Sequence, residues 1–222
     1  MSDDLLDLLL VGSGETLYMV LLSTFFAALI GLPLGVLLVV SQKGHVLEAP
    51  RFNKVFGTVI NIVRSFPSII LIVVLLPLSR LLVGTTLGTN AAIVPISIGA
   101  APFLARIIEN CLQEVQLGKI EAALAVGATP WTIITRVLIP EALPSLIRGV
   151  TIAIIAIIGF TAIAGAIGAG GLGSLAIRFG YLRFRDDVML TTIVILVILV
   201  QAIQWGGDLA ARRINRKRYK FD

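Results

Sequence analysis

Long apolar segments dominate this chain and restrict the folds that it can adopt. Its mean hydropathy is +1.00, and only 14% of its 222 residues are charged, whereas about a quarter of a soluble domain is charged. A helix needs roughly 20 apolar residues to cross a bilayer. Five segments meet this requirement, at about 16–40, 55–78, 89–111, 145–167 and 188–205. We therefore predict an all-α integral membrane protein with five transmembrane helices, built as a single domain over residues 1–222.

Basic residues are unevenly distributed between the segments that connect the apolar runs. Eleven lie on one side of the membrane: Lys43, Arg51, Lys54, Lys119, Arg136 and the six basic residues from Arg212 onward. Four lie on the other side: Arg80, Arg178, Arg183 and Arg185. Cytoplasmic loops carry the excess of Lys and Arg, so we predict an N-terminus outside and a C-terminus in the cytoplasm. The net charge of +5 then suits anionic membrane lipid, and we expect no nucleic-acid partner.

Local signals refine the expected spans. Residues 1–14 lack the basic start of a secretory signal, and we expect them to form a short amphipathic helix on the outer interface, with Ser13 as the N-cap of the first span. The second span is interrupted at Arg64-Ser65-Phe66-Pro67, where we expect a nearby oxygen to accept from the guanidinium. A direct role of Arg64 in transport is the alternative. Arg106 and Glu109 are three residues apart on one helix face and can pair or extend to the interface.

The sequence offers little for catalysis or for a cofactor. Cys111 and His45 are the only residues of their types, and we expect no metal site. Gly168–Gly173 matches the dinucleotide pattern G-x-G-x-x-G, but it follows an apolar span instead of a strand, so we expect these glycines to bend the chain or allow close helix packing. The chain contains no phosphate-binding loop G-x-x-x-x-G-K-[ST], so ATP, if used, must bind another chain. We predict a non-enzymatic subunit without a cofactor.

The segment at 118–149 differs from the apolar runs on either side, because it carries charged residues together with Pro130, Pro140 and Pro144. We expect these prolines to prevent one long helix. Thr129 followed by Pro130 predicts a helix N-terminus, with Trp131, Ile134 and Val137 or Leu138 on one face and an end before Pro140.

Just before this short helix, we expect Glu121-Ala122-Ala123 to continue the third span and Gly127 to permit a turn. The residues alone leave two interpretations equally open: the short helix rests on lipid headgroups, or it docks into a partner.

These same residues resemble a known cytoplasmic signature. Glu121-Ala122-Ala123, Gly127 and Pro140 match the spacing of EAA, three residues, G, nine residues and I-x-L-P, with Val137 and Ile139 in place of the signature's Ile and Leu. The chain therefore resembles the membrane subunit of a binding-protein-dependent ABC importer. Further segments, from the first span to the basic tail, are similar to the methionine-import permease subfamily: Arg64–Pro67, Ala101–Phe103, Gly168–Gly173 and Gly180-Tyr181.

The resemblance implies a pore subunit in the bacterial inner membrane that imports methionine, including its D and L forms. It implies a homodimer around one pore, two ATP-binding ABC ATPase subunits on the cytoplasmic face, and an extracytoplasmic methionine-binding lipoprotein. The region at 118–144 would then couple to the ATPase, with its short helix as the coupling helix. In that arrangement we expect Trp131 to anchor in a groove of the ATPase, Glu121 to contact its rim and Gly127 to act as the hinge; Ala122, Ala123, Thr129 and Pro130 complete the expected contact.

We expect the substrate path to be lined by Phe160, Thr161, Ile163 and Gly165, whose mixed apolar surface suits a thioether side chain. Core packing is the alternative for each of them. Three other functions stay open: import of another amino acid or a betaine, an ATP-independent channel or carrier, and a structural assembly or scaffold subunit. The absence of paired carboxylates within the spans weighs against an ion-coupled carrier.

Overall fold

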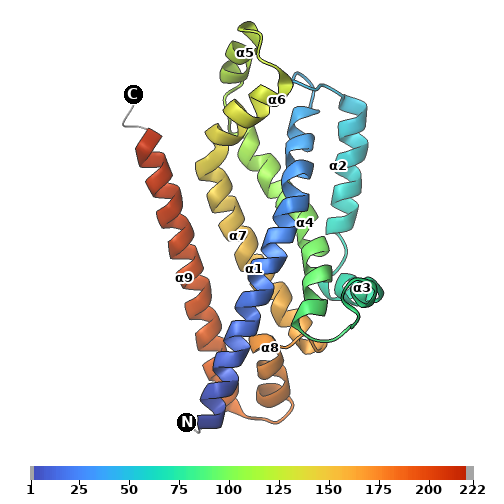
Figure 1. The fold of residues 1–222 in the computed structure, drawn as a ribbon, viewed down its shortest axis with the longest axis vertical. Helices are drawn as coiled ribbons and strands as arrows, with labels where there is room; N and C mark the ends of the chain where they lie inside the picture. The colour runs from blue at the N-terminus through green and yellow to red at the C-terminus, as the bar shows by residue number, and fades with distance from the viewer. Residues whose placement is uncertain (1–2, 219–222) are drawn as a thin grey trace. The chain divides into compact units, whose positions relative to one another are not determined.

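The computed structural model describes residues 3–218, and the end of the basic tail, including Lys220, lies outside them. Almost all of this part of the chain is helical and none of it forms a strand, which confirms the all-α prediction (Figure 1). In chain order the elements are α1 Asp3–Val40, α2 Pro50–Arg64, α3 Ser68–Val83, α4 Thr89–Gln113, α5 Leu117–Ala125, α6 Pro130–Ile133, the π-helical turn η1 Ile134–Leu138, α7 Ile139–Ala166, α8 Gly171–Leu175, the π-helical turn η2 Ala176–Tyr181 and α9 Asp186–Arg218.

Four helical stretches are long and apolar enough to cross a membrane: Leu5–Val40, Thr89–Gln113, Pro130–Ala166 and Asp186–Asn215. The pair α2 and α3 reaches the same threshold only when the two helices are counted as one broken span. The break is at 65–67, because Pro67 lacks the N–H that would continue the helix and disfavours helical geometry in Phe66. The interruption predicted there is confirmed.

Arg64, which precedes the break, differs from our expectation. Its side chain is exposed, and its guanidinium lies 5.9 Å from the centroid of the Phe103 ring. Among residues 3–218 it meets no oxygen acceptor. A guanidinium is attracted electrostatically to the face of an aromatic ring at this distance.

The prediction of a separate interfacial helix before the first span is wrong for the described residues. Helix α1 runs without interruption for 38 residues, and the Ser13 hydroxyl donates to the Leu9 carbonyl at 2.7 Å inside it, so Ser13 is not an N-cap. Gly31 and Gly35 lie farther along α1, where a Cβ would come within 2.9 Å of the Ala101 carbonyl and 2.7 Å of the Ala105 carbonyl. This one-turn glycine spacing lets two membrane helices approach closely.

The prolines at 140 and 144 do not end the helix, contrary to the prediction. Both lie inside α7, which follows α6 through η1 without a gap. In this turn the Ile139 N–H donates to the Ile134 carbonyl, five residues back. The wider turn accommodates the ring of Pro140, which would clash with the carbonyl four residues back in a regular α-helix.

The chain forms two compact units. The first comprises residues up to Ala27, Phe66–Ala100 and Ile154–Gln204, and its core includes Leu5, Leu9, Leu172 and Val188. The second comprises Ala28–Ser65, Ala101–Ala153 and the chain from Trp205. The α5–η1 segment, residues 117–138, belongs to the second unit, whereas α8 and the predicted path residues belong to the first.

Candidate functional site

A non-helical turn separates the α5–η1 segment from α4. Helix α4 ends at Gln113, and Val115 is buried in the turn that leads to α5. Glu121-Ala122-Ala123 therefore lies on a separate helix of nine residues and does not continue the third span as predicted. Within α5, the side chain of Ile120 is buried, and Lys119 pairs with Glu141 of α7 at 2.7 Å. These contacts fix α5 while Glu121 and Ala122 stay exposed.

Gly127 ends α5 in a defined geometry. Its φ is +79°, and its N–H donates to the Leu124 carbonyl at 2.9 Å while the next N–H, of Ala128, donates to Ala123 at 3.0 Å. This pair of bonds is a Schellman motif, which needs a left-handed residue at the position of Gly127. A Cβ there would meet nothing within 4 Å, so backbone conformation alone requires glycine. The turn predicted at Gly127 is confirmed.

Helix α6 starts as the sequence predicts. The Thr132 N–H donates to the Thr129 hydroxyl at 3.3 Å, and Pro130 occupies the first helical position. The expected single apolar face is wrong, because Trp131 is 73% exposed while Ile134 and Leu138 are buried. The π-helical geometry of η1 changes the spacing on which that expectation relied.

Exposed apolar side chains are concentrated on the start of this segment. Leu117, Leu124, Val126 and Trp131, which we call the α5–α6 apolar residues, are 61%, 47%, 84% and 73% exposed. All four belong to α5, α6 or the turn between them. Exposed apolar surface of this kind marks a site of contact with protein or membrane.

The predicted path residues on α7 divide into two pairs. Thr161 is 2% exposed, and its hydroxyl donates to the Ile158 carbonyl at 2.8 Å. Gly165 is packed against α8, where a Cβ would lie 2.5 Å from the Ser174 nitrogen. Phe160 and Ile163 are only half-buried. In this structure the first pair supports the helix, and the second pair is available for contact.

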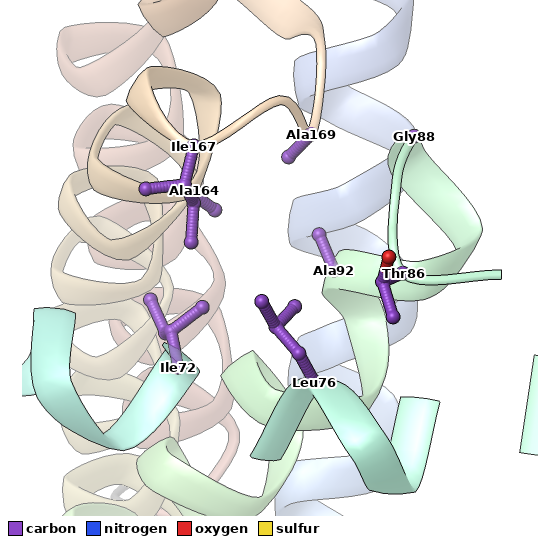
Figure 2. Close-up of a pocket in the computed structure, with 8 residues that line it drawn as sticks. All are labelled: Ile72, Leu76, Thr86, Gly88, Ala92, Ala164, Ile167 and Ala169. Atoms are coloured by element: carbon purple, nitrogen blue, oxygen red, sulfur yellow. The ribbon is translucent and has the colours of Figure 1, made fainter. Parts of the chain in front are cut away.

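A small cavity lies near the C-terminal end of α7, within the first unit. It is lined by Ile72, Leu76, Thr86, Gly88, Ala92, Ala164, Ile167 and Ala169. Figure 2 shows Ile72 and Leu76 projecting into it from α3. Its volume is about 10 Å³, which is near the minimum that holds one water molecule. It cannot enclose an amino acid, and none of the four predicted path residues lines it.

Arg106 and Glu109 form a buried pair, which confirms one of the two predicted alternatives. Their side chains meet at 2.6 Å and are 20% and 9% exposed. Arg106 also donates to the Gly57 carbonyl at 2.6 Å, and Gln42 donates to Glu109 at 3.2 Å. The pair therefore joins α4 to α2 and to the end of α1.

Sequence reasoning missed a polar contact between α1 and α8. The Gly171 N–H donates to the Glu15 carboxylate at 2.6 Å, and the Leu172 N–H donates to the Thr16 hydroxyl at 2.9 Å. The available signal was Glu15, an acidic residue directly before the apolar run at 16–40. The predicted first span leaves Glu15 out. The glycines of 168–173 do provide the bends and close packing expected of them: Gly168, Gly170 and Gly171 have positive φ, and a Cβ on Gly173 would lie 2.5 Å from the Ala162 Cα.

Among residues 3–218 there is no cluster of three or more His, Cys, Asp or Glu side chains that could hold a metal.

Comparison with known proteins gives consistent matches. Residues 31–217 match the model of the family described as binding-protein-dependent transport system inner membrane component. A probable D-methionine transport system permease protein of Vibrio cholerae serotype O1 is 46% identical over 211 residues, which cover 95% of this chain and 94% of that protein. The methionine import system permease protein of Bacillus subtilis (strain 168) is 50% identical over 203 residues, covering 91% of each chain.

Solved structures of ABC transporters also match this chain. A chain from the inward-facing conformations of the MetNI methionine ABC transporter matches with a TM-score of 0.95 and 47% identity, covering 96% of this chain and 99% of that chain. A chain of an amino acid ABC transporter with histidines matches with a TM-score of 0.74 at 21% identity, and this second likeness bears on the fold alone.

Proposed function

Because the chain belongs to the family of binding-protein-dependent transport system inner membrane components, we propose that it is the pore-forming permease of an ATP-driven importer that carries methionine into the cell. The main support for methionine as the substrate is the likeness to the methionine transporter structure, which combines 47% identity with coverage of 96% of this chain. The named relatives agree with it across proteobacterial and Bacillus sequences. The protein is a multi-pass component of the bacterial inner membrane.

The permease works, in this proposal, as a homodimer with two ABC ATPase subunits, and it receives methionine from an extracytoplasmic binding lipoprotein. The N-terminus is outside and the C-terminus cytoplasmic. This orientation puts the α5–η1 segment on the same side of the membrane as ATP, and the excess of basic residues in the matching loops supports it.

The α5–η1 segment, which overlaps the coupling region at 118–144, is the surface that docks on the ATPase. Trp131 is the apolar anchor, since a large exposed aromatic side chain on a well-supported helix is typical of an interface hot spot. Glu121 contacts the rim of the partner, and the small side chains of Ala122 and Ala123 let it approach. Thr129 and Pro130 fix the start of α6 and thereby the direction of Trp131.

Movement is transmitted from this surface to the spans in two ways. Helix α6 continues into η1 and α7 without a gap, so a displacement of α6 acts directly on a membrane helix. The Gly127 turn joins α5 to α6 and serves as the hinge between them. Such coupling requires two states with different contacts in each.

The substrate path is lined by Phe160 and Ile163 on α7, opposite the same residues of the second copy. Thr161 and Gly165 contribute indirectly, because the first satisfies a backbone carbonyl and the second allows α8 to pack against α7. The apolar character of these two half-buried side chains suits the thioether of methionine.

Reconstitution tests this function. The chain is assembled in liposomes with the ATPase and binding protein expressed from the same genome, and uptake of labelled methionine is measured with ATP, without ATP and with a non-hydrolysable analogue. We expect uptake only with hydrolysable ATP and binding protein, and competition by unlabelled methionine but not by betaine or histidine. Uptake of betaine or histidine in place of methionine would contradict the proposed substrate. Uptake that does not depend on ATP would contradict an ATP-driven importer.

A further inference from the structure

Side chains of α1 accept hydrogen bonds from the first N–H groups of the helical stretch that begins with α8. Helix α8 and η2 form one continuous helical stretch, Gly171 to Tyr181, whose first N–H groups have no partner within the stretch. Side chains of α1 accept from two of them: the Glu15 carboxylate from Gly171 at 2.6 Å and the Thr16 hydroxyl from Leu172 at 2.9 Å. Figure 1 shows α8 beside the first half of α1. We call these two contacts the α1–α8 clamp.

Local contacts and charge favour both acceptors. Thr16 is 1% exposed, and its hydroxyl donates to the Gly12 carbonyl at 2.9 Å, so its oxygen is oriented to accept from Leu172. Glu15 is half-buried, and its carboxylate lies where the positive end of the helix dipole favours a negative charge. Each side chain therefore satisfies a buried donor that would otherwise be left without a partner.

The glycines at the start of α8 pack closely against these side chains. A Cβ on Gly170 would lie 2.7 Å from a Glu15 carboxylate oxygen, and a Cβ on Gly171 would lie 2.7 Å from the Thr16 hydroxyl. Both residues also have positive φ, +87° and +76°. On the other side of the contact, a Cβ on Gly12 would lie 2.7 Å from Leu175. Backbone conformation thus requires glycine at 170 and 171, whereas a side chain at position 12 would require Leu175 to move.

The clamp is connected to the path residues by a second close contact. Gly173 packs against Ala162, where a Cβ would lie 2.5 Å from the Ala162 Cα, and Gly165 packs against Ser174. Backbone-to-backbone contacts of this kind leave no room for one helix to slide without the other. The position of α8 therefore sets the position of residues 160–165 of α7.

We infer that Glu15 and Thr16 are positioning residues for transport: they hold α8, and through α8 the C-terminal end of α7, so that Phe160 and Ile163 line the path in the correct orientation. They touch no substrate themselves. The inference rests on the proposed function for its transport role, while the clamp itself is a property of the first unit.

Four variants separate this role from general destabilisation. Glu15→Ala and Thr16→Val each remove one acceptor, while Glu15→Gln and Thr16→Ser each retain an oxygen that can accept from the same N–H. Glu48→Ala is the matched control, because Glu48 also accepts from a glycine N–H, that of Gly44 at 2.9 Å, but in an exposed loop.

The first measurement is amide hydrogen exchange of the peptide that covers 171–176 in the assembled complex. We expect exchange to accelerate by about tenfold in Glu15→Ala and Thr16→Val, as loss of one charge-assisted or buried hydrogen bond permits. Glu15→Gln and Thr16→Ser should stay near wild type, and Glu48→Ala should change exchange only around Gly44. Unchanged exchange at 171–176 in both Glu15→Ala and Thr16→Val would overturn the clamp.

The second measurement is methionine taken up per ATP hydrolysed, together with the methionine concentration for half-maximal uptake. We expect Glu15→Ala to lower uptake per ATP by about tenfold with the half-maximal concentration within about twofold of wild type, and Glu15→Gln to restore it. Faster exchange with unchanged uptake per ATP would overturn the positioning role. Failure of the wild-type complex to import methionine would instead reject the proposed function, and the exchange data would still decide whether the clamp exists.

Discussion

The helix contacts inside the two units and the α5–η1 segment use similar polar groups under opposite conditions. In the interior, the Arg106–Glu109 pair and the Glu15 contact with Gly171 are partly or largely buried, so little water is available to replace a lost partner. On α5–η1, the Lys119–Glu141 pair and the Thr129 cap are solvent-exposed. The same chemistry should therefore contribute much more to stability inside than on this segment.

The apolar groups show the reverse arrangement. Inside each unit, glycine and alanine bring backbones together and leave little room, whereas Trp131 and Val126 extend outward with 73% and 84% exposure. Interior contacts therefore hold the fold, whereas the α5–η1 segment keeps its apolar surface for association. Substitutions in the two regions should differ accordingly, with the largest change in free energy expected in the interior.

Arg106→Ala should have the largest effect, because it leaves the Glu109 carboxylate buried without its partner. We expect the free energy of unfolding to fall by about 3 to 5 kcal/mol, measured by thermal unfolding in detergent. Arg136→Ala, at an exposed arginine, is the control and should stay within about 0.5 kcal/mol. The double variant Arg106→Ala with Glu109→Gln should recover part of the loss; no recovery would show that the charge is not the cause.

Trp131→Ala should leave the stability of the permease nearly unchanged and weaken its association with the ATPase. A hot-spot side chain contributes about 2 kcal/mol or more, or roughly thirtyfold in the dissociation constant. The measurement is binding of the ATPase to the purified permease, alongside thermal unfolding. Trp205→Ala is the matched control, since Trp205 is 72% exposed on α9. Equal loss of binding in both variants would argue against the α5–α6 apolar residues as the docking site.

Thr129→Ala should have an intermediate, local effect. Loss of an N-cap costs about 1 kcal/mol, and here it should appear as faster hydrogen exchange in the peptide that covers 130–134. Thr135→Ala is a suitable control, because its hydroxyl donates to the Trp131 carbonyl at 2.8 Å within the helix and caps nothing. If the two variants exchange alike, the cap is not what fixes the start of α6.

Lys119→Ala should have the smallest effect. An ion pair with side chains 48% and 34% exposed contributes about 0.2 to 1 kcal/mol at most, and salt screens it. Thermal unfolding at low and high salt should therefore converge between this variant and wild type as salt rises. A large loss of unfolding free energy that does not change with salt would contradict this expectation. It would show that the Lys119–Glu141 pair stabilises α5 as strongly as Arg106 stabilises the interior.

Much of the fold follows from patterns that depend on composition and neighbouring residues. Apolar length located the spans, Thr129-Pro130 located the start of α6, and Gly127 located a left-handed turn. Each of these signals is local, so no knowledge of distant contacts was needed. The break at Pro67 was equally readable, because proline removes a donor wherever it occurs.

The errors arose where distant contacts decide the outcome. Ser13 and Gly14 looked like a boundary, yet α1 continues through them because α8 packs against it at Gly12. Pro140 predicts the end of the short helix, yet the helix continues because the π-helical turn before it accommodates the proline ring. The role of Glu15 could not be found from neighbours at all, since its partner lies 156 residues away in sequence.

The π-helical turn at Ile134–Leu138 amounts to one extra residue carried inside an otherwise regular helix. Each residue of an α-helix advances about 100° around the axis, so gaining or losing one residue in this turn would present a different side of α6 while leaving α7 unchanged. The chain can thus alter which side chains meet a partner by changing the number of residues, without substituting any residue of the contact itself. Comparing the length of this turn among permeases with different ATPases would reveal whether evolution has used that freedom.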